Sequence, residues 1–401
     1  MEQFANNAQS TLASGINNSV AFLTVQSATG FSTQGTFRIQ IDNEIMLVTG
    51  VSGNVFTVSR GQEGTVAAAH NAGACVTQEL TAGALAALKN DVLSSIVPAD
   101  LGMSDGQLVQ DLNGALVGIP MFLTFGGRLT LTSNTPVTTS DVTGAGTIYY
   151  TPYLHDRVTI YDGTRWKVYT FTQRSLALTL TSGKNYDVFL YDNSGTLTLE
   201  LSAAWTNDTT RADGLTTVDG VSVKSSNNTR LWLGTIRASG TNTTEDSLAR
   251  RFCWNAFNRL PRKMVVKESS VNWSYGTNAY RQANASSANS LQFVLGALVE
   301  PVAAKVVVTF DDGNNAQYAP GIGIDNTTAN NADLTTCGLN LAGAGTGIRY
   351  GAFAFWDGWP SAVGYHYTAW LETAPSGVAV TVYGTGGVTF IQSGISGVVL
   401  A

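Results

Sequence analysis

The stretch GTIRASGTNTTEDSLARRFCWNAFNRLPR, residues 234–262, is unusually rich in charged and aromatic side chains for this chain. Asp246 can cap a helix, and Pro261 can end it. Between them, apolar residues recur near helical spacing. These residues are Leu248, Phe252, Phe257 and Leu260. We therefore predict that a short helix forms the second half of this joint segment.

Long runs of short apolar stretches, separated by Gly, Asn and Asp turns, lie on both sides of the joint segment. We interpret the segment as a connection between two β domains, in which arginines stack and pair at an interface. The predicted interface residues are Arg250, Arg251, Phe252, Trp254, Phe257 and Arg259. The sequence leaves open whether they hold two domains of one chain or two chains together.

Composition favours a chain of many short strands. Charged residues make up 12% of the 401 residues, about half of the usual share of roughly 25%, and 42 residues are glycine. The net charge of −6 argues against a nucleic-acid partner, because such proteins present a basic face. The three cysteines are far apart and odd in number, so we expect buried thiols and neither a disulfide framework nor a zinc site.

The chain divides by pattern into four parts. Residues 1–80 predict a small β module, with Phe37, Ile39 and Ile41 alternating with polar residues in one strand. Residues 81–120 predict a short helix and a Gly-rich linker. Residues 121–261 predict a central β-sandwich that ends in the helix of the joint segment, and residues 262–401 predict a C-terminal β-sandwich. The expected fold class is mainly β, with several antiparallel modules.

The helix predicted after Thr81 has one apolar stripe. The stripe consists of Leu85, Leu88, Val92 and Ile96. It spans two heptads, fewer than a secure coiled-coil prediction requires. Two interpretations stay open: the helix docks on its own domain, or it packs against copies of itself.

No catalytic motif stands out, so we expect no enzymatic activity, cofactor or metal site. His70, His155 and His366 fall in three different predicted domains. The segments 311–314, DDGN, and 343–347, GAGTG, lack the residues of a calcium or phosphate loop and predict turns. A glycan hydrolase needs two acids in one groove. Candidates exist only as scattered acids: Glu200, Asp208, Glu300 and Glu372.

An aromatic cluster near the C-terminal end is the candidate ligand site. Its predicted glycan-binding residues are Trp356, Asp357, Trp359, Tyr365, Tyr367 and Trp370. Aromatic faces beside polar groups suit sugar rings, whose C–H faces are apolar. The segment WDGWP, residues 356–360, predicts a loop tip with two exposed tryptophans. The alternative is that these rings fill a core or a subunit interface.

Two stretches resemble structural proteins of tailed-bacteriophage particles, of the tail-fibre or head-fibre kind. The first is LASGINNSVAFLTV, residues 12–25, continued by GTFRIQIDNEIMLVTGVSGNVFTVSRGQEGT, residues 35–65. The second includes FGGRLTLTS, residues 125–133, and IYYTPYLHDRVTIYDGTRWKVYTF, residues 148–171. The resemblance implies an N-terminal module that docks on the particle, outward β domains, and a homotrimer.

The resulting expectation is a virion appendage that contacts a host-surface glycan and other virion proteins. It is predicted to be made in the host cytoplasm and released by lysis, because the N-terminus MEQFANNAQS lacks the features of a signal peptide and no apolar run reaches the length of a membrane span. A capsid decoration or head fibre is the alternative, and a glycan hydrolase is a weaker one.

Overall fold

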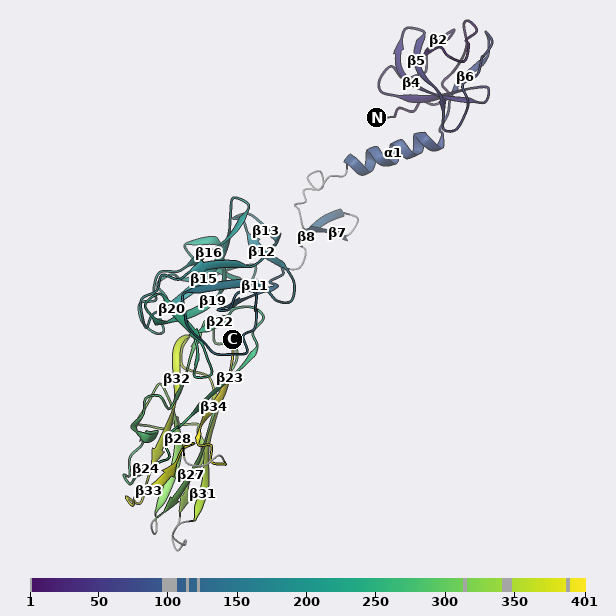
Figure 1. Ribbon diagram of the computed structural model, residues 1–401. Helices are drawn as coiled ribbons and strands as arrows, with labels where there is room; N and C mark the ends of the chain where they lie inside the picture. The colour runs from purple at the N-terminus through teal and green to yellow at the C-terminus, as the bar shows by residue number, and fades with distance from the viewer. Residues whose placement is uncertain are drawn as a thin grey trace. The chain divides into compact units, whose positions relative to one another are not determined.

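The computed structural model describes residues 2–95, 107–112, 115–120, 123–312, 316–340, 348–386 and 390–401. Contacts divide the chain into unit 1, Met1–Ile119, and unit 2, Pro120–Ala401. The described residues form mainly antiparallel sheets, which confirms the predicted fold class (Figure 1). The GAGTG segment, the end of the DDGN segment, and residues 98–106 and 113–114 of the predicted linker lie outside the described residues.

Unit 1 contains a β module with its own core. Its sheet has the order β1-β6-β3-β4-β5-β2. The strands are β1 (Gln9–Thr11), β2 (Phe22–Thr24), β3 (Phe37–Ile41), β4 (Glu44–Ser52), β5 (Val55–Gln62) and β6 (Cys75–Gln78). The alternation predicted for residues 37–41 is confirmed, because Phe37, Ile39 and Ile41 are buried while Arg38 and Gln40 are not.

A helix, α1 (Ala82–Ser95), follows β6, as predicted (Figure 1). Thr81 caps it, because its hydroxyl accepts a hydrogen bond of 3.1 Å from the backbone N–H of Ala84. Strands β7 (Gln107–Leu112) and β8 (Ala115–Pro120) then pair with each other.

The first half of unit 2 surrounds a core of aliphatic and aromatic residues between Leu129 and Cys253. Small sheets β14-β11-β9 and β12-β13 lie beside the path β16-β15-β19-β20 of a larger sheet. The strands are β9 (Gly127–Thr130), β10 (Val142–Ala145), β11 (Thr147–Pro152), β12 (Arg157–Tyr161), β13 (Trp166–Thr170), β14 (Arg174–Ala177), β15 (Asn185–Asn193), β16 (Thr196–Leu201), β17 (Leu215–Val218), β18 (Val221–Lys224), β19 (Asn227–Gly240), β20 (Thr243–Asp246), β21 (Arg250–Arg251) and β22 (Cys253–Asn255).

The second half of unit 2 has a larger core, formed mainly by residues 264–401. Sheet β23-β34-β27-β31-β29 lies on one side, and β26-β32-β28-β30 continues the larger sheet. The strands are β23 (Pro261–Lys267), β24 (Asn272–Tyr275), β25 (Arg281–Gln282), β26 (Ser290–Leu295), β27 (Val302–Asp312), β28 (Gln317–Ile324), β29 (Thr335–Cys337), β30 (Leu339–Asn340), β31 (Arg349–Gly358), β32 (Gly364–Thr373), β33 (Val380–Tyr383) and β34 (Gly394–Leu400). A short 3-10 helix covers Ala283–Ala285.

The helix predicted in the joint segment is wrong. The segment instead forms β20, β21 and β22, with a tight turn in which the backbones of Ser247 and Arg250 exchange hydrogen bonds. Asp246 does not cap a helix, because its carboxylate accepts hydrogen bonds from Arg251 and Arg262. Burial explains the error: residues 251–255 are buried on both strand faces, so their apolar pattern carries no period that separates strand from helix.

One sheet joins the two halves of unit 2. Strand β21 pairs with β20 of the first half through Arg251 and Asp246, and with β26 of the second half in parallel. Neighbouring residues of β22 point to opposite sides, so Cys253 belongs to the first core and Trp254 to the second. The joint segment therefore contributes buried side chains to both cores of unit 2.

Candidate binding surfaces

The predicted interface residues contact their own chain from both halves of unit 2. Trp254 is buried and stacks on Trp232 at 5.5 Å, and Phe257 stacks on Phe125 at 4.0 Å. Arg259 pairs with Glu300 at 2.8 Å. These contacts place aromatic and charged residues of the joint segment between strands from each half.

The joint segment also contains a buried ion-pair network. The carboxylate of Asp246 accepts hydrogen bonds of 2.8 Å from both Arg251 and Arg262, and one of 3.1 Å from the hydroxyl of Thr138. Arg250 is more exposed and pairs with Glu245 at 3.1 Å. The two adjacent arginines therefore have different surroundings, and Arg250 is the one that reaches the surface.

A second buried carboxylate, which the sequence did not single out, organises the loop after β16. Asp187 is fully buried and accepts hydrogen bonds from the indole N–H groups of Trp205 and Trp232, each at 2.9 Å. It also accepts bonds from the hydroxyl of Thr235 and from Arg211. The Arg211 guanidinium lies over both indole rings, at 4.5 and 5.2 Å from their centroids. This network fixes a surface loop to the larger sheet.

Two of the predicted glycan-binding residues belong to the core. Trp356 is 1% exposed and Trp370 is 0% exposed, and both lie in the core of the second half of unit 2. The predicted loop tip is wrong in part, because Trp356 and Asp357 are inside strand β31. Alternation along the strand turns Trp356 inward and leaves Asp357 exposed, while Trp359 follows the strand and is 53% exposed.

The other two predicted residues share a half-buried surface on strand β32, which we name the tyrosine surface: Tyr365, Tyr367, Gln292, Arg237 and Arg250. The ring centroids of Tyr365 and Tyr367 are 6.4 Å apart, and the Tyr365 hydroxyl donates a hydrogen bond to Gln292 at 3.1 Å. The Arg237 guanidinium lies 3.6 Å from the centroid of the Tyr365 ring. Arg250 lies in strand β21, directly opposite Gln292.

Both phenol groups of the tyrosine surface stay protonated at neutral pH. Burial raises the pKa of Tyr365, while the positive charge of Arg237 opposes the increase. Burial and the charge of Asp325 raise the pKa of Tyr367. The surface therefore presents hydroxyl donors, an amide and two guanidinium groups beside aromatic rings, which is a suitable combination for hydroxyl-rich ligands.

The acids considered for glycan hydrolysis have cationic partners. Glu200 pairs with Lys224, Asp208 with Arg237, Glu300 with Arg259, and Glu372 with Arg281. The described residues contain no group of three or more His, Cys, Asp and Glu side chains that could hold a metal ion. No helix in the described part of the chain has the length and apolar character to cross a membrane.

The cysteines are separate, but their burial differs from the prediction. Cys253 is buried, Cys337 is partly buried and Cys75 is exposed. The expectation of three buried thiols is therefore wrong for Cys75. In β6, Val76 turns into the core of unit 1, so the preceding Cys75 points to the opposite face.

No protein-family model and no curated protein matches this chain. Among solved structures, the insecticidal delta-endotoxin Cry8Ea1 from Bacillus thuringiensis aligns with a TM-score of 0.21 and 8% identity, over 69% of this chain and 51% of that chain. A Cry1Da tryptic core variant from Bacillus thuringiensis aligns with a TM-score of 0.17 and 7% identity, over 64% of this chain and 48% of that chain. The chain spans about half the length of these structures. At these TM-scores the similarity indicates neither a shared fold nor a shared function.

Proposed function

We propose that this protein is a structural component of a tailed-phage particle, an appendage that unit 1 anchors and that presents unit 2 for contact with the host surface. The observation that carries the proposal is the division into a small β module with its own core and a larger β unit with two cores. This modular organisation, together with the resemblance of residues 12–65 and 125–171 to phage virion proteins, supports an anchored and projecting role.

The tyrosine surface is the proposed contact with host glycan. Tyr367 and Gln292 lie opposite each other on neighbouring strands, beside the arginine-covered ring of Tyr365. A sheet fixes their spacing, so the surface needs little reorganisation on binding. Each contact is weak, and several copies per particle would multiply the affinity through avidity. We include self-association as a homotrimer in the proposed function.

Immunogold electron microscopy of intact particles tests the location. The antibody is raised against residues 262–401. Gold at the tail or collar supports the appendage, whereas gold spread over the head would replace this proposal with the capsid decoration or head fibre. Absence of gold from particles that contain the protein by immunoblot would contradict exposure of the second half of unit 2.

A matched pair of variants tests the glycan contact. We expect Tyr367→Ala to weaken binding of the purified protein to a host-envelope glycan preparation at least tenfold. Tyr161→Ala, in strand β12 and also half-buried, should leave the binding unchanged. Equal binding by both variants and the original protein would exclude the tyrosine surface as the contact.

A further inference from the structure

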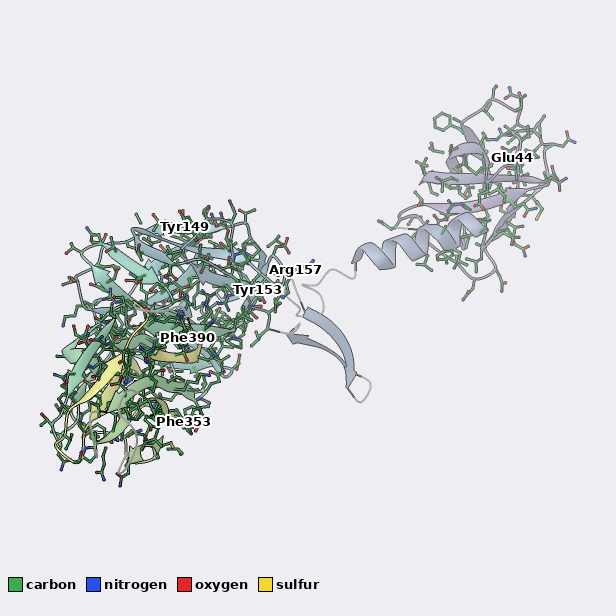
Figure 2. All side chains as sticks on the ribbon, turned by 60° about the horizontal axis from the view of Figure 1, so that its bottom comes forward. Glu44, Tyr149, Tyr153, Arg157, Phe353 and Phe390 are labelled. Carbon is green, nitrogen blue, oxygen red and sulfur yellow. The ribbon has the colours of Figure 1, made fainter. Side chains whose placement is uncertain are left out.

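The sheet β23-β34-β27-β31-β29 has one face turned to the core and one face turned to solvent, and the solvent face carries exposed apolar side chains as well as polar ones. In β31 the small residues Ala352 and Ala354 are buried with Trp356. Phe353, which Figure 2 labels, and Phe355 alternate with them along the strand and lie on the opposite face. They are 50% and 43% exposed. The bulkier phenylalanine rings thus point away from the core.

Strand pairing arranges the solvent-facing side chains in three rows that cross the sheet. The first row is Lys263, Val398, Ala303 and Asp357; the second is Val265, Ser396, Lys305, Phe355 and Thr335; the third is Lys267, Gly394, Val307, Phe353 and Cys337. We call these three rows the outer face. Val307 is 48% exposed and Val398 is 41% exposed, so the apolar area is continuous with the two phenylalanines.

The outer face has bulky rings beside hollows. One hollow, of about 410 Å³, is lined by Ala303, Ser396 and Gly397 next to Phe355. A second hollow, of about 440 Å³, is lined by Val307 and Gly351 next to Phe353 and Phe355. Aromatic projections next to cavities floored by small residues give the face the relief needed to interlock with another surface.

Charge is distributed unevenly across the outer face. Lys263 and Lys267 lie on the β23 side, Lys305 lies on the middle strand β27, and Asp357 lies on the β31 side of the same sheet. Consider copies of the chain that are related by rotation about an axis parallel to the strands. Each row of one copy then lies at the same height along this axis as the same row of the next copy. The β23 side of one copy meets the β31 side of the next. Lysine then approaches Asp357, so the face is complementary in charge to a second copy of itself.

The area is adequate for part of an interface. With strands about 4.8 Å apart and about 3.3 Å per residue along a strand, three rows over five strands cover roughly 480 Å². A stable interface buries about 800 Å² per partner, so the outer face would supply more than half of it.

We propose that further copies of this chain cover the outer face, arranged around an axis parallel to its strands. The inference rests on the self-association included in the proposed function, and it does not depend on where a particle carries the protein. It assigns Phe353 and Phe355 as the main apolar side chains of the contact, with the lysine–aspartate pairs at its edge.

Light scattering coupled to gel filtration, over a wide range of protein concentration, measures the mass as a multiple of 42.3 kDa. We expect the original protein to be oligomeric and the Phe353→Ser, Phe355→Ser double variant to dissociate at a concentration about a hundredfold higher than the original protein does. Phe22→Ser, which alters an exposed phenylalanine of β2 in unit 1, should not change the mass. Unchanged tryptophan fluorescence verifies that unit 2 stays folded in the double variant.

Charge reversal tests the arrangement without altering the main apolar side chains of the contact. Lys263→Glu alone and Asp357→Lys alone should each weaken association, and the double reversal should restore it. A monomeric original protein would overturn the self-association, although gold labelling of particles could still support the appendage. An oligomer that the phenylalanine substitutions leave intact would overturn the outer face as its contact, and failure of the double reversal to restore association would overturn the axis parallel to the strands.

Discussion

Glu44 is the centre of the polar network in unit 1, and its charge should control how unit 1 responds to acid. Glu44 is labelled in Figure 2. Its carboxylate is almost fully buried and accepts two hydrogen bonds of 2.8 Å from Arg60. It also accepts bonds from the backbone N–H groups of Gly61 and Ala68, and it contacts His70 at 2.9 Å. Glu44 thereby fixes the loop that follows β5.

Burial by itself raises the pKa of Glu44, but the hydrogen bonds from Arg60, Ala68, His70 and Gly61 together lower it from 4.5 to about 2. The carboxylate therefore stabilises the folded state above about pH 4.5, and this contribution disappears as the pH falls toward 2. The difference between the two pKa values corresponds to about 3 kcal/mol. After screening by solvent, we expect about 2 kcal/mol to be measurable.

Glu44→Gln should remove about 2 kcal/mol from the stability of unit 1 near neutral pH and flatten its response to acid. All eight tryptophans lie beyond residue 165, so tryptophan fluorescence reports on unit 2 only. Hydrogen exchange of peptides from residues 2–78, followed by mass spectrometry in increasing urea, measures unit 1 separately. Glu79→Gln makes the same charge change at an exposed side chain and serves as the control.

The reasoning would be refuted if Glu44→Gln and Glu79→Gln had equal stability at every pH. It would also be refuted if Glu44→Gln retained the same loss of stability between about pH 4.5 and 2 as the original protein. Other carboxylates contribute to that loss in both proteins, including Glu63, whose pKa is lowered by hydrogen bonds from Thr81 and Gly83 against the effect of burial. The difference between variant and original protein is therefore the decisive quantity.

Three further predictions concern unit 2. Asp187→Ala should destabilise it by about 3 kcal/mol in urea unfolding monitored by tryptophan fluorescence, because Arg211 and two indole N–H groups lose their buried acceptor; a change below about 1 kcal/mol would contradict this. Burial raises the pKa of the Cys253 thiol to about 12. A thiol reagent at mildly alkaline pH should therefore modify exposed Cys75 rapidly and Cys253 only in denaturant. Peptide mass spectrometry measures the modification of each cysteine. Trp254→Ala should lower the free energy of unfolding of unit 2 by about 3–5 kcal/mol, because it leaves a cavity where both halves of unit 2 meet. A loss of fluorescence without a change in the unfolding midpoint would exclude this stabilising role of Trp254.

Strand content was predictable because short apolar runs alternate with Gly, Asn and Asp turns along the chain. In residues 37–41 the alternation is unambiguous, and the structure buries the predicted set. Helix α1 was predictable from its cap and stripe. The joint segment was not, because polar and apolar residues alike are buried through residues 251–255. Partners that lie far away in the sequence, such as Arg262 and Thr138 for Asp246, decide its conformation, and local spacing does not contain them.

Two of the predicted site residues, Trp356 and Trp370, were misplaced for a related reason. Tryptophans concentrated in a short stretch predicted a surface for sugar, yet Trp356 and Trp370 are both buried in the core of the second half of unit 2. Sequence alone gives the period of a strand but not which face turns inward when both faces are apolar. The tyrosine surface depends on Arg237 and Gln292, which approach Tyr365 only through strand pairing and loop packing.

Strand β31 has apolar side chains on both of its faces, and the face that it buries indicates whether another surface covers the opposite one. A monomer would stabilise itself best by burying Phe353 and Phe355, because each ring removes more apolar area from water than an alanine does. The chain instead buries Ala352 and Ala354 beside Trp356 and leaves both rings half exposed. The exposed half of each ring adds nothing to the stability of the isolated chain, whereas it gains free energy if a second surface covers it. The orientation of β31 therefore favours a protein whose outer face is completed by another copy.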